Sequence, residues 1–235
     1  MRNRATEVST KDHERLTSIA VAASSSYQDV GVAVTIDVPG SAHRAAPPLA
    51  ADPAGGEWES VLRNNIIGAY NVFEACRQQQ VGRIVAASTI QVSTGHRQQE
   101  PYNAVSQGRP EPLPSGVPLV SVDVPAEPRN LYASSKVFSE SLCRTYAFSH
   151  GMSCLAIRIG WVVGEDSVPN ARSEDIWCSQ RDIAGLIRAC VDAPEDLRFD
   201  ILYGMSNNRF RWVDLSNARQ KLGFEPQDRA EDRSP

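Results

Sequence analysis

A tyrosine and a lysine four residues apart, Tyr132 and Lys136, form the pair in this sequence that is best suited to chemistry. Side chains at positions i and i+4 lie on one face of a helix, so the phenol and the ammonium would be neighbours. A positive charge beside a phenol lowers the tyrosine pKa from its ordinary value of about 10. Such a tyrosine can exchange a proton with a hydroxyl or carbonyl group of a substrate. The same spacing also occurs on ordinary solvated helices. The surrounding sequence is therefore needed to choose between a catalytic pair and an ordinary tyrosine with a solvated lysine.

The segments around this pair predict two buried strands and the helix between them. Residues 82–89 are mostly apolar and end in the hydroxyls of Ser88 and Thr89. Residues 131–150 have helical spacing, and residues 153–159 are a second short apolar run. A strand ending in hydroxyls, a helix carrying the tyrosine and lysine, and a further strand predict an α/β arrangement with these side chains at one edge of a sheet.

An asparagine, Asn65, interrupts the apolar face of a helix expected over residues 57–76. A buried amide must be hydrogen-bonded, and it is usually kept where it holds other groups in place. Asn65 is therefore a further candidate for the site, with a hydrogen-bonded core asparagine as the alternative.

These segments together resemble the extended short-chain dehydrogenase/reductase family over about residues 47–230, with Asn65-Ile66-Ile67-Gly68 matching the N-x-x-G motif of that family. The family includes NAD-dependent sugar epimerases, dehydratases and dehydrogenases. The resemblance implies an α/β fold with a Rossmann-like, mostly parallel sheet flanked by helices and a small C-terminal substrate lobe. It also implies NAD as the cofactor, with NADP as an open alternative, and a sugar-like small molecule as the substrate.

The resemblance assigns roles to individual residues. Catalytic roles fall on Thr89, with Ser88 as the alternative hydroxyl, and on Tyr132, Lys136 and Asn65. Cofactor contacts fall on Leu49, Ala50, Ala51, Asn65, Tyr132, Lys136, Ile159 and Gly160. Substrate contacts fall on Thr89, Ile90, Trp161 and Arg172, and no metal site is implied.

The C-terminal half looks most similar to the uronate dehydrogenase branch of the family, through Arg158-Ile159-Gly160 and the later Arg172. In that branch an arginine at the Arg172 position clamps the sugar carboxylate, which suits a planar, bidentate donor. A solvent-facing loop arginine is the alternative. The branch also has Asn-His after the serine pair, whereas this chain has Ile90-Gln91, so a uronate and another sugar-like alcohol both stay open as substrates.

The N-terminal segment departs from the family pattern. A dinucleotide-binding unit normally opens with a glycine-rich turn and a helix N-terminus that holds the pyrophosphate. The only glycines before residue 55 are Gly31 and Gly40, while the alternation over residues 30–38 predicts a strand. We therefore expect an incomplete or atypical first βαβ unit. The chain divides into an atypical segment 1–46, a Rossmann-like core 47–160 and substrate-lobe elements with a tail 161–235.

Two further segments are expected to lack regular structure. Residues 95–128, rich in Pro, Gly, Gln and Ser, predict a long surface loop. The charged tail, residues 227–235, is expected to be mobile.

Composition excludes several other classes of protein. A net charge of −4 without a basic cluster argues against a nucleic-acid surface. The five cysteines lack C-x-x-C spacing and are expected to be small buried residues of a reducing compartment. No run approaches the roughly 20 apolar residues of a membrane span, and no signal-peptide pattern begins the chain, so a cytoplasmic protein is expected.

The function implied by the resemblance is an NAD(P)-dependent oxidoreductase acting on a sugar or sugar acid, with Tyr132 as the proton acceptor. One alternative is a sugar epimerase or dehydratase of the same family. Another is a truncated or frameshifted remnant that cannot bind NAD because the glycine-rich turn is missing. A homodimer through the helices of the catalytic half is the assembly that the resemblance allows.

Overall fold

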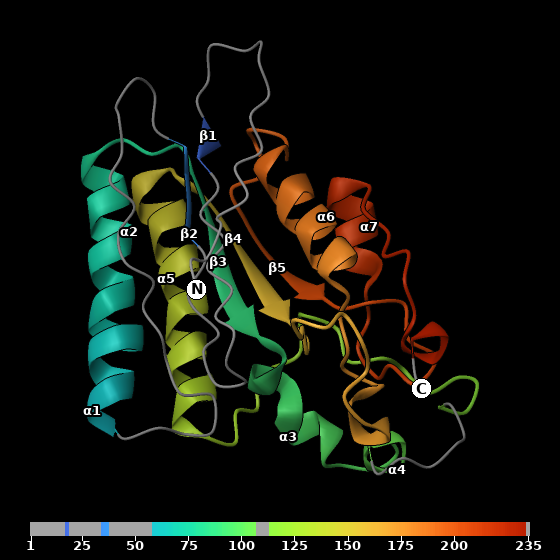
Figure 1. Ribbon diagram of the computed structural model, residues 1–235. Coiled ribbons are helices and arrows are strands. Elements are labelled where there is room, and N and C mark those ends of the chain that lie inside the picture. Colours follow the sequence, from blue (N-terminus) through green and yellow to red (C-terminus); the bar gives the residue numbers. More distant parts are fainter. Residues whose placement is uncertain (1–16, 19–33, 38–57, 107–112, 234–235) are drawn as a thin grey trace, which may run out of the picture.

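The computed structural model describes residues 17–18, 34–37, 58–106 and 113–233. A five-stranded sheet in the order β1-β2-β3-β4-β5 lies at its centre (Figure 1). Its strands are β1 (Thr17–Ser18), β2 (Val34–Asp37), β3 (Arg83–Thr89), β4 (Ser153–Ile159) and β5 (Phe199–Gly204). The last three are parallel, so their carboxyl ends meet at one edge of the sheet.

Helices cover both faces of this sheet. On one face lie α2 (Gly68–Gln78) and α5 (Leu131–His150), and on the other lie α6 (Gln180–Val191) and α7 (Ser216–Leu222) (Figure 1). The first helix of the described core is built from α1 (Trp58–Ser60), a π-helical stretch η1 (Val61–Ile67) and α2, which follow one another directly. The predicted fold class, a Rossmann-like and mostly parallel sheet flanked by helices, is confirmed.

Alternating side chains of β3 build the two halves of the core. Ala86 packs with Phe73 and Cys143 on the face covered by α2 and α5. Its neighbour Val85 packs with Leu186 of α6 on the opposite face. Because both faces are covered, residues 84–87 of the strand are all apolar instead of alternating with polar residues, as is typical of parallel sheets.

Two short strands of the N-terminal segment, β1 and β2, lie within the described residues. β2 lies within the predicted strand over residues 30–38, and it pairs with β3 in antiparallel orientation, with Thr35 opposite Val85. The first strand of a doubly wound nucleotide-binding unit is parallel to its neighbours. Leu49, Ala50 and Ala51, which were assigned cofactor contacts, lie outside the described residues.

The expectation of a long loop without regular structure over residues 95–128 is wrong in part. A 3-10 turn η2 (Ile90–Ser93) runs into α3 (Thr94–Arg97), and α4 (Tyr102–Ser106) follows. Helices of four or five residues are too short to show a hydrophobic period. They are held by tertiary contacts instead, such as the backbone bond from Gly95 to Glu127 at 2.9 Å.

The described part of the tail, up to residue 233, is held against the domain, contrary to the expectation of a mobile tail over residues 227–235. The carboxylate of Asp182 accepts hydrogen bonds from the backbone N–H groups of Gln227 and Asp228. Asp228 in turn accepts from the Ser179 hydroxyl at 2.7 Å and pairs with Arg181. Sequence charge suggested a solvated end, but Asp228 and Arg233 form ion pairs with Arg181 and Asp166, which lie far away in the chain.

The five cysteines are buried and not in disulfides, as expected of small core residues. Burial raises the pKa of Cys76 to about 11 and that of Cys154 to about 12, so these thiols stay protonated and unreactive at neutral pH. Among the helices of the described ranges, none has both the length and the apolar character that crossing a membrane requires.

Candidate active site

Hydrogen bonds tie the first turn of α5 to its capping residue, Asn130, and through Gln91 to Thr89. The side chain of Asn130 caps the helix by accepting from the backbone N–H of Ala133 at 2.7 Å. The same side chain donates to the Gln91 side chain at 2.8 Å, and the Gln91 backbone N–H donates to the Thr89 hydroxyl at 3.2 Å. The N-terminus of α5 is thereby tied to the carboxyl end of β3, where the candidate site lies.

Tyr132 is fully buried beside Thr89. Burial raises the pKa of Tyr132 well above its usual value, and the nearby Thr89 hydroxyl opposes this shift to a smaller extent. Among the described residues no group meets hydrogen-bond geometry with the Tyr132 hydroxyl. The structure therefore brings the two predicted hydroxyls together and leaves the phenol available to another group.

Lys136 is also fully buried, one turn further along α5. Its ammonium donates to the Ala87 carbonyl at 3.1 Å and lies 5.6 Å from the centre of the Tyr132 ring. Burial lowers the pKa of Lys136 to about 8. The expected lowering of the Tyr132 pKa by this lysine is not found, because burial raises this pKa and only the Thr89 hydroxyl opposes the shift.

Asn65 lies in η1 and reaches the catalytic face of α5. Its Nδ2 donates to the Ser135 hydroxyl at 2.8 Å, which donates in turn to the Tyr132 carbonyl at 2.6 Å. The Oδ1 atom of Asn65 has no hydrogen-bond partner among the described residues. π-Helical stretches often occur at functional sites, and this one directs a half-satisfied buried amide at the helix that carries Tyr132.

Ser88 does not share the position of Thr89. Its hydroxyl donates to Glu140 Oε1 at 2.6 Å, and Glu140 forms a buried ion pair with Arg158. Side chains alternate along a strand, so only one hydroxyl of the pair can lie beside Tyr132. The geometry favours Thr89, and the alternative assignment of Ser88 is not supported.

Three residues at the end of β4 were assigned cofactor or substrate contacts, namely Ile159, Gly160 and Trp161. Ile159 pairs with Thr89 in the sheet register, and a Cβ on Gly160 would lie only 2.3 Å from the Ile176 carbonyl, so no side chain fits there. Trp161 forms a bridge with Trp177. These residues lie at the carboxyl end of β4 or directly after it, where ligands bind in open α/β sheets.

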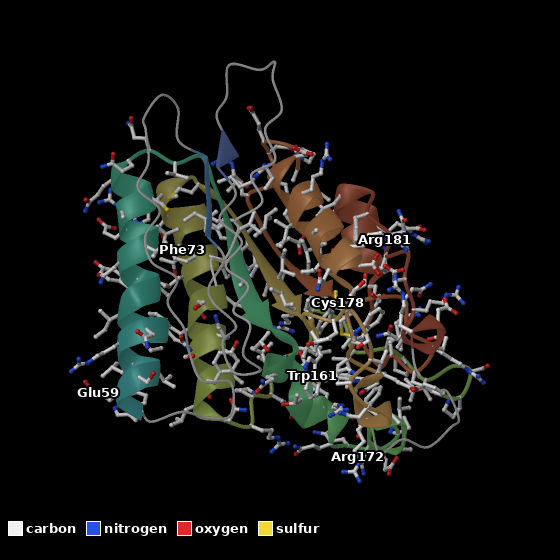
Figure 2. All side chains as sticks on the ribbon, viewed as in Figure 1. Glu59, Phe73, Trp161, Arg172, Cys178 and Arg181 are labelled. Atoms are coloured by element: carbon white, nitrogen blue, oxygen red, sulfur yellow. The ribbon has the colours of Figure 1, made fainter. Side chains whose placement is uncertain are left out.

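Ile90 and Arg172 are not joined to this cluster. Ile90 is buried and packs with Tyr203 and Trp212, so the structure gives it a packing role rather than a substrate contact. Arg172 is exposed in a short turn, and Figure 2 shows it at the lower edge of the molecule, below Trp161. Its backbone carbonyl is held by Arg97 at 2.8 Å.

Three residues at the site were missed by sequence reasoning. Ser135 lies three residues after Tyr132, and Glu140 lies four after Lys136, so helical spacing alone places both on the catalytic face. Gln91 was noted only as a departure from the family pattern, yet it joins Thr89 to Asn130.

The sequence matches the model of the NAD dependent epimerase/dehydratase family over residues 42–213. It is 34% identical over 193 residues to the L-arabinose 1-dehydrogenase (NAD(P)(+)) of Haloferax volcanii, covering 77% of this chain and 72% of that protein. It is 34% identical over 174 residues to the uronate dehydrogenase of Agrobacterium fabrum, covering 74% of this chain and 57% of that protein.

The fold is similar to the crystal structure of uronate dehydrogenase from Agrobacterium tumefaciens, with a TM-score of 0.61 and 33% identity, covering 75% of this chain and 58% of that one. The chain thus spans less than two thirds of the length of the uronate dehydrogenases that it matches. The matched region contains η1, β3, α5 and β4, which carry the candidate site. This chain belongs to the NAD-dependent epimerase/dehydratase family.

Proposed function

We propose that this chain carries the catalytic side chains of an NAD(P)-dependent oxidoreductase that oxidises a hydroxyl group of a sugar or sugar acid. The observation that supports this most directly is the buried arrangement of Thr89, Tyr132 and Lys136 at the edge where three parallel strands end, with a phenol that no described residue hydrogen-bonds. Similarity to an arabinose dehydrogenase and to uronate dehydrogenases gives the same reaction class.

The residues fit the ribose and nicotinamide half of NAD. Two buried polar atoms, Asn65 Oδ1 and the Tyr132 hydroxyl, lack partners among the described residues, and the Lys136 ammonium has donors beyond its single bond to Ala87. Lys136 would hold ribose hydroxyls. Bound NAD would supply the hydride acceptor. The described residues contain no glycine-rich helix N-terminus for the pyrophosphate.

In the proposed mechanism Tyr132 removes the proton of the substrate hydroxyl. Its raised pKa means that the phenol is neutral before the substrate and the cofactor are in place, so it must first be deprotonated. The protonated form of Lys136 favours the phenolate through its charge. Thr89 would orient the substrate oxygen by a hydrogen bond, and Asn65, through Ser135, would keep the first turn of α5 in place.

We propose Arg172 as the group that selects a sugar acid over a neutral sugar. Support comes from its exposed guanidinium, which matches a carboxylate bidentately, and from the Arg97 contact that holds its backbone. Against it stands its place at the edge of the molecule (Figure 2). Comparing a uronate with the corresponding neutral aldose therefore tests this assignment separately from the reaction class.

We also propose a homodimer through α2 and α5. Ile67 and Tyr70 are 47% and 49% exposed, and their spacing of three residues places them on one face of the first helix. Light scattering of the purified chain tests this, with Ile67→Glu/Tyr70→Glu as the variant that should be monomeric. A monomeric wild type would contradict the assembly.

The experiment that tests the function follows NADH formation from a panel of aldoses and uronates at saturating NAD. Net NADH supports a dehydrogenase. Interconversion of sugars without net NADH would indicate an epimerase instead, because an epimerase returns the hydride to the substrate. No reaction and no NAD binding would indicate a protein that has lost the cofactor site.

A further inference from the structure

A buried ion pair joins α5 to β4 next to the candidate site. The Nε and Nη2 atoms of Arg158 donate to the two carboxylate oxygens of Glu140, each at 2.9 Å. Glu140 is 5% exposed and Arg158 is 2% exposed, so both charges are shielded from water. A bidentate pair of this kind fixes the relative orientation of the elements that carry it.

The pair is bonded to the chain on both sides of Thr89. Glu140 accepts from the hydroxyl of Ser88, the residue directly before Thr89, at 2.6 Å. Arg158 Nη1 lies 3.2 Å from the hydroxyl of Ser93, which ends the turn after Thr89. Arg158 also donates to the Tyr203 hydroxyl at 3.2 Å, and Tyr203 and Ser93 are themselves bonded at 2.9 Å.

The carboxylate at the centre of this network shares a helix face with the catalytic candidates. Glu140 lies four residues after Lys136 and eight after Tyr132, so one to two helical turns separate them. Because one helix carries both side chains, the Glu140 carboxylate that binds Ser88 has a fixed position relative to the phenol of Tyr132. No part of the proposed mechanism uses Glu140 or Arg158 directly.

We infer that Glu140 and Arg158 are positioning residues that fix the Thr89 hydroxyl relative to Tyr132. This inference rests on the proposed oxidoreductase function for its catalytic consequence. A buried ion pair is weak evidence for a gain in stability, since apolar residues of similar size often serve as well. A positioning role explains why two polar partners of the pair, Ser88 and Ser93, lie on either side of Thr89 in the chain. A purely stabilising role does not explain this placement.

The chain offers a matched control in Asp228. It is also a buried carboxylate, 6% exposed, that pairs with an arginine and accepts from a serine hydroxyl. Its side-chain hydrogen bonds go to Arg181 and Ser179 at the N-terminal end of α6, and not to residues 88–93. Glu140→Gln and Asp228→Asn thus each neutralise a buried carboxylate that pairs with an arginine and accepts from a serine hydroxyl.

The experiment compares wild type, Glu140→Gln, Asp228→Asn and the double variant Glu140→Gln/Arg158→Met. For Glu140→Gln we expect kcat to fall by roughly tenfold to a hundredfold with KM nearly unchanged, because misplacement of a catalytic group by about 1 Å has effects of this size. Asp228→Asn should lower the melting temperature to a similar extent while kcat stays within about twofold. The double variant should regain thermal stability but keep the low kcat.

Amide hydrogen exchange supplies a readout that does not depend on activity. Exchange of residues 88–94 should become faster in Glu140→Gln and in the double variant, and it should be unchanged in Asp228→Asn. If wild type forms no NADH, the proposed function fails, and this exchange pattern alone decides the positioning role. Unchanged exchange over residues 88–94, or a kcat that recovers together with stability in the double variant, would overturn the inference.

Discussion

The ammonium of Lys136 donates to the Ala87 carbonyl on β3 at 3.1 Å while it lies 5.6 Å from the ring centre of Tyr132. One cation thus links the catalytic helix to the strand that ends in Thr89. Both Lys136 and Tyr132 are fully buried, and burial shifts each toward its neutral form: the lysine pKa is lowered and the tyrosine pKa is raised. Binding of substrate and cofactor must change this balance before the proton can move.

The lowered pKa of Lys136 should appear as a pH dependence of stability. Its pKa is about 8 in the folded chain and about 10.4 when unfolded. Between these values the unfolded state binds more protons, so the contribution of Lys136 to the free energy of unfolding rises with pH from about 8 to about 10. Above that range the raised pKa of Tyr132 acts in the opposite direction.

Chemical denaturation of wild type and Lys136→Met over this pH range measures the effect. We expect wild type to gain on the order of a few kcal/mol relative to the variant between pH 8 and pH 10. Parallel pH profiles for the two proteins would show that the lysine is not desolvated as described.

The Asn65–Ser135 hydrogen bond should contribute to the free energy of unfolding. Ser135→Ala leaves the buried Nδ2 group of Asn65 without its acceptor, which should cost about 1–3 kcal/mol of unfolding free energy. The neighbouring Ser134 is exposed, so Ser134→Ala is the matched control and should change stability by less than about 0.5 kcal/mol. Equal effects of the two substitutions in urea denaturation would contradict the role of Ser135.

Much of the fold could be predicted from the sequence, because its strongest signals are periodic. The helix over residues 131–150 and the strand over residues 153–159 have the predicted bounds. Their apolar patterns are long, and Gly151 ends the helix with a φ of 71°. The short helices α3 and α4 could not be predicted, because a few residues cannot show a period and tertiary contacts decide their conformation.

The site was predicted less completely than the fold. The spacing of Tyr132 and Lys136 predicted their shared face, but it could not reveal that burial, rather than their mutual attraction, dominates their pKa values. Choosing between Ser88 and Thr89 required the Glu140 contact, which joins residues 52 positions apart. Contacts of this range depend on how the elements pack, and no local pattern contains them.

We expect weak binding of NAD by this chain. The pyrophosphate normally binds the N–H groups of a glycine-rich turn and the positive end of a helix. Without such a turn, dissociation constants on the order of 1 mM or weaker are expected. Titration calorimetry measures this directly. Binding at micromolar NAD would show that residues outside the described ranges complete the cofactor site.

Removing the proposed carboxylate clamp should change substrate preference more than turnover. Arg172→Ala should raise KM for a uronate by about tenfold or more, as expected for loss of a charged hydrogen-bond donor. The KM for a neutral aldose should stay nearly constant, since that substrate has no carboxylate. Arg188→Ala, which removes an arginine on the outer side of α6 with 82% side-chain exposure, is the control. If both substrates respond equally to Arg172→Ala, the clamp assignment is wrong.

The most direct test of the central claim is NADH formation by wild type and Tyr132→Phe, assayed side by side with sugars and sugar acids at high NAD. The variant loses the proton acceptor, so kcat should fall by a hundredfold or more. Its melting temperature should be unchanged or higher, because the removed hydroxyl is buried and lacks a hydrogen-bond partner among the described residues. A wild type that reduces NAD with a sugar and a folded Tyr132→Phe that does not are the results we expect. A folded Tyr132→Phe that turns over as fast as wild type would contradict the account.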